Sequence, residues 1–406
     1  MRILIYTGKG GVGKTSMASA AACRLASEGK RVVIMSTDQA HSLGDAFRQQ
    51  LGNERTQVAE NLYAVEIDTN QESRKAWGSL HDYLLTMMKK RKTVGIEADE
   101  VLVFPTFEEL FAMLRILDEY ESGGCDVLIV DCAPTGETLS MLRFPERLGL
   151  IVRRFLPLIR AMTMTAGFAI SLRTGVPKPH DVVFRDFDVL TQRLMKLQKI
   201  LSDPETTSIR IVTTPERIVM DEARRNYTWM HLYGYNVDAV IVNRIYPEEA
   251  MGGYFRGWSR MQEESLQLAR ESFPEQALFT MELQDHEIGG PEMLLAAADL
   301  VYGDVDISQV FSKEKTFWIE KKDGNTIFAV ALPFAHEDEV EAGMLEGDII
   351  ISFRNERRRF KLPENLRGFG VRSYSWSEGI LSIVLGAYRA EQGKTENQSQ
   401  EEKFCN

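Results

Sequence analysis

The stretch YTGKGGVGKTS, residues 6–16, constrains the fold of this chain more than any other part of the sequence. A short apolar run precedes it and the helix-like stretch MASAAA follows it, so the sequence predicts a buried strand, a glycine-rich loop and a helix in succession. Gly8, Gly13, Lys14 and Thr15 fit the pattern G-x-x-x-x-G-K-[ST] of a phosphate-binding loop. A chance glycine-rich turn is the alternative, and the flanking strand and helix argue against it.

The chemistry of such a loop explains its residue types. Backbone N–H groups curl around phosphates, and glycine allows φ values and close approaches that a Cβ would block. The helix that follows points its positive N-terminal end at the anion. Lys14 is expected to reach the β- and γ-phosphates of ATP, and the Thr15 hydroxyl to ligate Mg²⁺. The residues predicted to contact the nucleotide are Gly8, Lys9, Gly10, Gly11, Val12, Gly13, Lys14, Thr15 and Ser16.

Length and composition narrow the class of protein. A chain of 406 residues is too long for one ordinary core, so two domains are expected. The net charge of −11 argues against general nucleic-acid binding. The N-terminus leads straight into a strand without a charged and apolar leader, so we expect no signal peptide. The uncharged apolar stretch Ala161–Leu172 is too short to span a bilayer.

The first three quarters of the chain alternate short apolar runs with amphipathic ones. Continuous apolar runs are typical of strands buried on both faces of a parallel sheet, and this alternation predicts a doubly wound, mostly parallel α/β fold. Ligands of such a fold bind at the carboxyl ends of the strands. The expected strands are Ile3–Tyr6, Val32–Ser36, Val127–Val130, Ile209–Thr213 and Val237–Val242, and the expected helices include Glu108–Glu121 and Pro215–Leu232.

The sequence changes character after about Phe311. Two β-rich runs flank Asp323-Gly324-Asn325, which is a hairpin signal, and no long helical period follows. We therefore expect a small antiparallel β-sandwich over 315–388, after a phosphate-loop domain over 1–311. The polar stretch 391–406 is expected to be a flexible tail. The expected further strands are Asp348–Phe353, Arg358–Leu362, Val371–Trp376 and Ile380–Leu385.

Two carboxylates stand at expected strand ends. Asp38, in STDQAHSLGDAF, is the candidate for positioning or deprotonating the attacking water and for holding a magnesium-bound water. An N-cap of the next helix is the alternative for Asp38. Asp131, in VLIVDCAPTGETL, fits the carboxylate that holds Mg²⁺ through water, and the loop after it resembles a switch element. His41 and Asp45 are weaker candidates.

Asn243 and Arg244 end another expected strand, in VIVNRIYP. An asparagine side chain at this place can bind the edge of an adenine base. An ordinary loop cap is the alternative, and the sequence does not decide between the two.

Taken together, GKGGVGKT, STDQAHSLGDAF, DCAPTGETL, VTTPERIVMDEARR and VNRIYP resemble the ATPase family of the arsenite-pump subunit ArsA. The same family includes the ATPases that target tail-anchored membrane proteins. The resemblance covers about residues 1–311 and implies a homodimer of the deviant phosphate-loop class. In that class the early lysine, here Lys9, crosses the dimer interface and neutralises charge on the partner's nucleotide, as an arginine finger does. A solvated loop lysine is the alternative for Lys9.

The C-terminal part resembles an α-crystallin (small heat-shock) domain through its strands, FKLP (Phe360–Pro363) and GILSIVL (Gly379–Leu385). Some bacterial and plastid members of the targeting-ATPase family resemble this pairing of domains. The family also builds a client groove in a helical subdomain, here expected at about 85–200. The apolar, methionine-bearing stretch Leu148–Leu172 falls in it and suits promiscuous apolar binding, although such a stretch also fits a core or a dimer contact.

The chain also departs from the family pattern. The region Met251–Leu266 lacks the C-x-x-C that binds zinc between targeting subunits, so a zinc-stapled dimer is not expected. The four cysteines (Cys23, Cys125, Cys132 and Cys405) are scattered, which disfavours arsenite as an effector and indicates reduced thiols in the cytoplasm. Gln39 and Ser42 replace a usual Pro and Asn of targeting members, which leaves the details of water positioning open.

These features lead to one functional hypothesis, one rival, and a third alternative, a nucleotide-gated scaffold in which hydrolysis is incidental. The hypothesis is a cytoplasmic, homodimeric Mg-ATPase that couples ATP binding and hydrolysis to binding, targeting or chaperoning hydrophobic protein segments. The rival is a soluble ATPase subunit that energises a membrane transporter for an anion such as arsenite.

Overall fold

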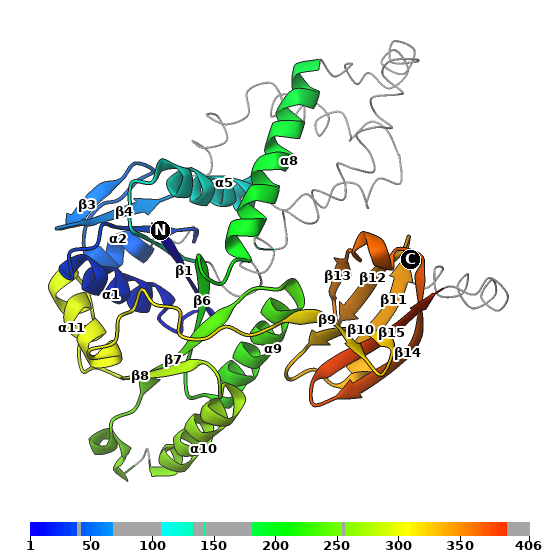
Figure 1. Ribbon diagram of the computed structural model, residues 1–406. Helices are drawn as coiled ribbons and strands as arrows, with labels where there is room; N and C mark the ends of the chain where they lie inside the picture. Colours follow the sequence, from blue (N-terminus) through cyan, green and yellow to red (C-terminus); the bar gives the residue numbers. More distant parts are fainter. Residues whose placement is uncertain are drawn as a thin grey trace, which may run out of the picture.

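A computed structural model of the protein describes residues 1–38, 42–67, 107–132, 136, 142, 181–253 and 256–387. Its centre is an eight-stranded sheet in the order β3-β4-β2-β5-β1-β6-β7-β8 (Figure 1). All neighbours in this sheet pair in parallel except β3 with β4. The strands are β1 (Arg2–Thr7), β2 (Val32–Ser36), β3 (Thr56–Ala59), β4 (Leu62–Glu66), β5 (Val127–Asp131), β6 (Thr207–Thr213), β7 (Val237–Ile245) and β8 (Ala277–Glu282).

Successive residues of each central strand enter different hydrophobic cores, as the alternation of a pleated strand requires. On β1, Ile3 and Ile5 pack in the core that contains α5, α8 and α9, whereas Leu4 and Tyr6 pack in the core of α1 and α11. The sheet is therefore covered on both faces, which confirms the doubly wound prediction. The helices are α1 (Lys14–Ser27), α2 (Ser42–Phe47), α5 (Phe107–Ser122), α8 (Asp181–Leu201), α9 (Arg217–Tyr233), α10 (Arg256–Ser272) and α11 (Pro291–Tyr302).

The C-terminal strands form two small antiparallel sheets, in the orders β14-β15-β10-β9 and β11-β12-β13. The predicted hairpin is present, with Asp323 and Gly324 at φ 51° and 75° in its two-residue turn. The strands are β9 (Phe317–Lys322), β10 (Asn325–Ala331), β11 (Val340–Leu345), β12 (Asp348–Phe353), β13 (Glu356–Phe360), β14 (Phe369–Ser377) and β15 (Ile380–Ala387), and three short 3₁₀ helices are Glu248–Met251, Glu337–Glu339 and Glu364–Leu366.

The C-terminal β module, residues 317–387, packs against α9 (Figure 1). Tyr233 near the end of α9 donates a hydrogen bond to Glu356 (2.8 Å), and Arg358 donates to the carbonyl of Leu232 (2.5 Å). The Thr228 hydroxyl donates to the carbonyl of Pro333. Apolar residues of the module continue the core on the α9 face of the central sheet, so module and sheet share one hydrophobic core.

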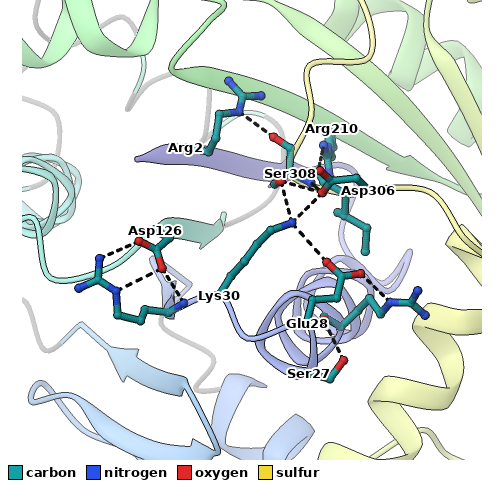
Figure 2. A network of polar contacts seen from close by, with 11 residues as sticks. Arg2, Ser27, Glu28, Lys30, Asp126, Arg210, Asp306 and Ser308 are labelled. Atoms are coloured by element: carbon teal, nitrogen blue, oxygen red, sulfur yellow. Dashed lines mark hydrogen bonds and ion pairs between the residues drawn. The ribbon is translucent and has the colours of Figure 1, made fainter.

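Charged side chains form a network at the amino-terminal ends of the central strands, at the opposite end of β1 from the phosphate loop. Lys30, just after α1, donates to Asp306 (2.8 Å) and Ser308 (2.9 Å), and Arg2 donates to the Ser308 carbonyl (3.0 Å), as Figure 2 shows. These bonds fasten the segment after α11 to the beginning of β1 and the end of α1. Desolvation raises the pKa of the Asp306 carboxyl, but the bonds from Lys30 and Ser308 outweigh it and lower that pKa to about 2.

The bounds that the sequence predicted agree closely with the structure for several of these elements. β2 and β12 have their predicted bounds, and α5 and α9 differ from prediction by two residues at most. Three predictions lie wholly or mostly outside the described residues: the client groove around Leu148–Leu172, most of the helical subdomain at 85–200, and the tail at 391–406.

The docking of the β module on α9 can be tested by substitution. Tyr233→Phe removes the hydroxyl that donates to the buried Glu356 carboxylate, so we expect the free energy of unfolding to fall by about 1–3 kcal/mol. Urea unfolding followed by tryptophan fluorescence measures this change. Tyr374→Phe on β14 removes the hydroxyl of an exposed tyrosine and is the matched control, for which a change below about 0.5 kcal/mol is expected. Equal effects of the two substitutions would contradict this view of the interface.

Candidate nucleotide site

The candidate site lies at the carboxyl ends of the central parallel strands. A cavity of about 590 Å³ opens there. The phosphate loop and the first turn of α1 form its floor, α2 forms one wall, and the segment after β8 forms another. Its lining residues include Gly10, Gly11, Gly13, Lys14, Thr15, Ser16, Asp38, Ser42, Asp45, Asn243, Arg244 and residues 282–284 and 286–288.

Glycine is required at two positions of the loop. A Cβ on Gly8 would lie 2.1 Å from the carbonyl oxygen of Val212 on β6. Gly13 has φ 92°, and a Cβ there would lie 2.3 Å from Nδ2 of Asn243 on β7. The loop backbone therefore presses against two strands, which leaves its N–H groups on the cavity side for an anion.

The residues that begin α1 carry the polar groups of the floor. Lys14 is buried, and its amine donates to the backbone carbonyl of Lys9 (3.3 Å) across the loop. The Thr15 hydroxyl lies 3.1 Å from the hydroxyl of Ser42 on α2. The arrangement places a cation and a hydroxyl ligand where the sequence motif predicts them, next to the cavity.

Asp131, the last residue of β5, lies beneath this floor with an exposed fraction of 1%. Neither of its carboxylate oxygens has a hydrogen-bond partner of normal geometry among the described residues. Burial raises the pKa of Asp131 to about 7, and repulsion from Asp38 adds to the rise, whereas the nearby Thr15 hydroxyl and Lys14 amine lower it. A buried carboxylate beside a threonine hydroxyl, with no hydrogen bond of normal geometry to either oxygen, fits the environment of a hydrated Mg²⁺.

Asp38 and Asp45 line the cavity from the side of β2 and α2. The backbone N–H of Asp38 donates to the Ser36 hydroxyl (3.1 Å) at the end of β2. His41 and Gln39 lie outside the described residues, so their placement relative to the cavity stays a prediction. Asp38 is thus placed at the cavity with a partly exposed carboxylate, as its proposed work on a water molecule requires.

Lys9 does not belong to the cavity lining, although its neighbours Gly10 and Gly11 do. Its amine lies 3.5 Å from the Glu222 carboxylate on α9, and its side chain is 39% exposed. The two lysines of the loop therefore point to different places: Lys14 lies over the loop itself, and Lys9 reaches out to a neighbouring helix.

Asn243 braces the loop. Its Nδ2 donates to the carbonyl of Val12 (2.8 Å), and its Oδ1 accepts from the backbone N–H of Arg244 (2.8 Å). Arg244 has a positive φ of 58° and is exposed at the cavity. These contacts favour the structural alternative for Asn243, and recognition of the adenine edge by this pair stays a prediction.

Three parts of the candidate site were not predicted from the sequence. Ser42 lies against Thr15, and the buried Glu66 at the end of β4 accepts a hydrogen bond from the backbone N–H of Gly44 in α2 (2.8 Å). The segment Glu282–Ile288 supplies a whole cavity wall. Glu66 could have been found as a carboxylate at the end of an apolar run, but the wall after β8 carries no motif that signals it.

The described residues contain no cluster of three or more histidine, cysteine, aspartate or glutamate side chains that could hold a metal by themselves. A magnesium ion here would therefore need Thr15, Asp131 and phosphate oxygens together, which is the usual way that Mg²⁺ binds beside nucleotides. Cys23, Cys125 and Cys132 are buried and unpaired by disulfides. Within the described ranges, the helices include none that is long and apolar enough to cross a membrane.

A glycine-rich loop between a buried parallel strand and a helix, with a lysine, a threonine and a strand-end carboxylate around one cavity, defines a phosphate-loop NTPase. Comparison with known proteins narrows this class. Residues 1–303 match the profile of the anion-transporting ATPase family of ArsA, and residues 323–385 match that of the HSP20-like domain found in ArsA. The chain belongs to the ArsA family, and it is an ATP hydrolase.

Relatives extend over nearly the whole chain. A protein named putative arsenical pump-driving ATPase 1 from Aquifex aeolicus is 32% identical over 377 residues, which cover 90% of this chain and 95% of the relative. A putative arsenical pump-driving ATPase from Prosthecochloris vibrioformis is 33% identical over 379 residues, or 91% and 92% of the two chains. The ATPase GET3 of Podospora anserina is 27% identical over 306 residues, or 72% and 88%. The resemblance to the ArsA family and the match of the C-terminal module to a small heat-shock domain are thereby confirmed.

The buried carboxyl of Asp131 predicts a pH dependence of stability. Its pKa of about 7 in the folded protein lies above its ordinary value of 3.8, so between these values the folded state binds a proton that the unfolded chain has released. The free energy of unfolding therefore falls as the pH rises toward 7, because the buried Asp131 carboxyl has to release its proton. The decrease is complete above pH 7.

Asp131→Asn removes this effect. Without nucleotide and with EDTA present, we expect the variant to be more stable than the parent at about pH 8 by on the order of 4 kcal/mol, with a smaller difference at about pH 5. Urea unfolding at several pH values measures it. Asp45→Asn, at an exposed position of the same cavity, is the control. A difference that does not change with pH would contradict the assignment.

Proposed function

We propose that this protein is a cytoplasmic, homodimeric Mg-ATPase that couples ATP binding and hydrolysis to the binding, targeting or chaperoning of hydrophobic protein segments. The observation that carries the mechanism is the division of the two loop lysines, one over its own cavity and one directed away from it. Family membership supports ATP as the nucleotide.

The residues of the site have different roles in catalysis. Backbone N–H groups of 8–16 hold the phosphates, and Lys14 balances charge on the β- and γ-phosphates. Thr15 and Asp131 would hold magnesium, which when bound draws charge from the phosphate oxygens. Asp38 orients the attacking water and accepts its proton. The base and ribose would bind in the part of the cavity that Arg244 and the segment Glu282–Ile288 line. The phosphates would bind at the floor, which the phosphate loop forms.

Lys9 completes the site of a second subunit. Its amine stands outside its own cavity on an exposed side chain, so it can leave Glu222 and reach an anion that faces this surface. A cation that arrives only when two subunits close stabilises charge in the transition state and couples hydrolysis to closure. Closure and reopening would then hide or expose an apolar surface.

Two regions are proposed to bind hydrophobic protein segments. The stretch Leu148–Leu172 is proposed to contribute a client groove because its methionines adapt to varied apolar shapes. The domain limits proposed are 1–311 for the ATPase and 315–388 for the β module. The module's match to an HSP20-like domain supports chaperone contacts for it.

A second candidate function is that of a soluble ATPase subunit of an anion efflux pump, which the names of the two bacterial relatives favour. Cys23 lies in α1, whereas Cys125 and Cys132 flank the opposite ends of β5, and all three are buried, which argues against a thiol site for arsenite. An ATPase assay with either arsenite or a detergent-solubilised apolar helix distinguishes the two: stimulation by the helix alone supports our proposal, and stimulation by arsenite alone supports the rival.

The catalytic assignments predict the effect of two substitutions. Lys9→Ala and Asp38→Asn should each lower kcat for ATP hydrolysis by about 10²-fold or more, because one removes transition-state charge stabilisation and the other removes the general base. Steady-state ATPase assays measure the rates, and light scattering measures the dimer mass with ATP bound. Lys313→Ala, which removes an exposed lysine paired with Glu205, is the control. Near-normal turnover of both site variants would contradict the mechanism.

A further inference from the structure

The ion pair between Lys9 and Glu222 suggests how the ATPase is kept idle in a single subunit. We propose that Glu222 holds Lys9 within its own subunit until a nucleotide-loaded partner takes the amine away. Glu222 is thus a positioning residue that acts through Lys9. This inference rests on the proposed function, in which Lys9 acts on the partner's nucleotide.

Glu222 is the less exposed partner of the pair, and Lys9 is the more exposed one. Glu222 lies in the second turn of α9, next to the buried Ala223 and two residues after the buried Met220. The far end of α9 is fastened to the β module, where Tyr233 donates a hydrogen bond to Glu356, and to the segment before the module, where His231 lies 3.0 Å from Glu314. The C-terminal end of the helix that carries Glu222 is therefore fastened, whereas Lys9 reaches Glu222 from an exposed position on the loop.

The ion pair between Lys9 and Glu222 is weak enough to be broken when two subunits close. The side chains of Lys9 and Glu222 are 39% and 22% exposed, and the amine lies 3.5 Å from the carboxylate, so water screens the attraction. Pairs of this kind shift an equilibrium by about twofold to fivefold. A triphosphate carries several negative charges against the single charge of Glu222, so the partner's nucleotide wins the amine when the subunits close.

The neighbourhood of Glu222 offers a matched control. Asp221 is the preceding residue on α9, carries the same charge and lies 3.6 Å from Arg224 rather than near Lys9. Its removal changes the net charge of the helix by the same amount. Any effect that depends only on the overall charge of this surface therefore appears equally in Asp221→Asn and Glu222→Gln.

The test is the dependence of ATPase activity on subunit concentration at saturating Mg-ATP. For Glu222→Gln we expect half-maximal specific activity at a subunit concentration about 4-fold to 25-fold lower than for the parent, because two Lys9 amines no longer have to be released when a dimer forms. The kcat at high concentration should equal that of the parent, since Glu222 touches no reacting atom. Asp221→Asn should follow the parent curve. Urea unfolding of both variants checks that they fold.

Three results would overturn the inference: a Glu222→Gln curve that superimposes on the parent's, one matched by Asp221→Asn, or a Glu222→Gln kcat that falls. The Lys9→Ala variant separates this failure from failure of the proposed function. If Lys9→Ala is inactive and Glu222→Gln is unchanged, only the hold by Glu222 is wrong. If Lys9→Ala is fully active, the action of Lys9 across the dimer is wrong as well.

Discussion

The close approach of the phosphate loop to the central sheet is the constraint on which the rest of the site depends. The loop lies against the Val212 carbonyl and the Asn243 amide so closely that no Cβ fits at Gly8 or Gly13. Because one side of the loop is occupied by strands and braced by Asn243, its N–H groups are left for an anion on the other side. The position of the cavity, and of every side chain around it, follows from this contact.

The same contact separates the tasks of the two lysines. Lys14 lies at the start of α1, where it is buried over the loop and lines the cavity. Lys9 lies on the outer side and meets α9, the helix that also carries the β module. A single loop thus carries one buried lysine beside its own cavity and one exposed lysine paired with a neighbouring helix, and the family's HSP20-like module sits on that helix.

Features with strong local chemistry could be predicted from the sequence. The strand–loop–helix unit, the strand-end carboxylates Asp38 and Asp131 and the Asp323-Gly324 turn all depend on residue types at fixed spacing. The wall Glu282–Ile288, the contact of Glu66 with α2 and the docking of the module on α9 depend on tertiary packing between segments far apart in the chain. Glu66 could have been found as a carboxylate at the end of an apolar run, but nothing in the local pattern of the wall or of the docking surface distinguishes either from ordinary surface positions.

A subunit-mixing experiment tests the central claim, that Lys9 serves the partner's nucleotide, most directly. In a mixed dimer of Lys9→Ala and Asp38→Asn subunits, the first subunit keeps Asp38 and receives Lys9 from the second, so one of the two sites is complete. Equal mixing of the two inactive variants, with exchange of subunits, should therefore restore about a quarter of the ATPase activity of the parent. Activity that stays at the mean of the two separate variants at every mixing ratio would contradict the account.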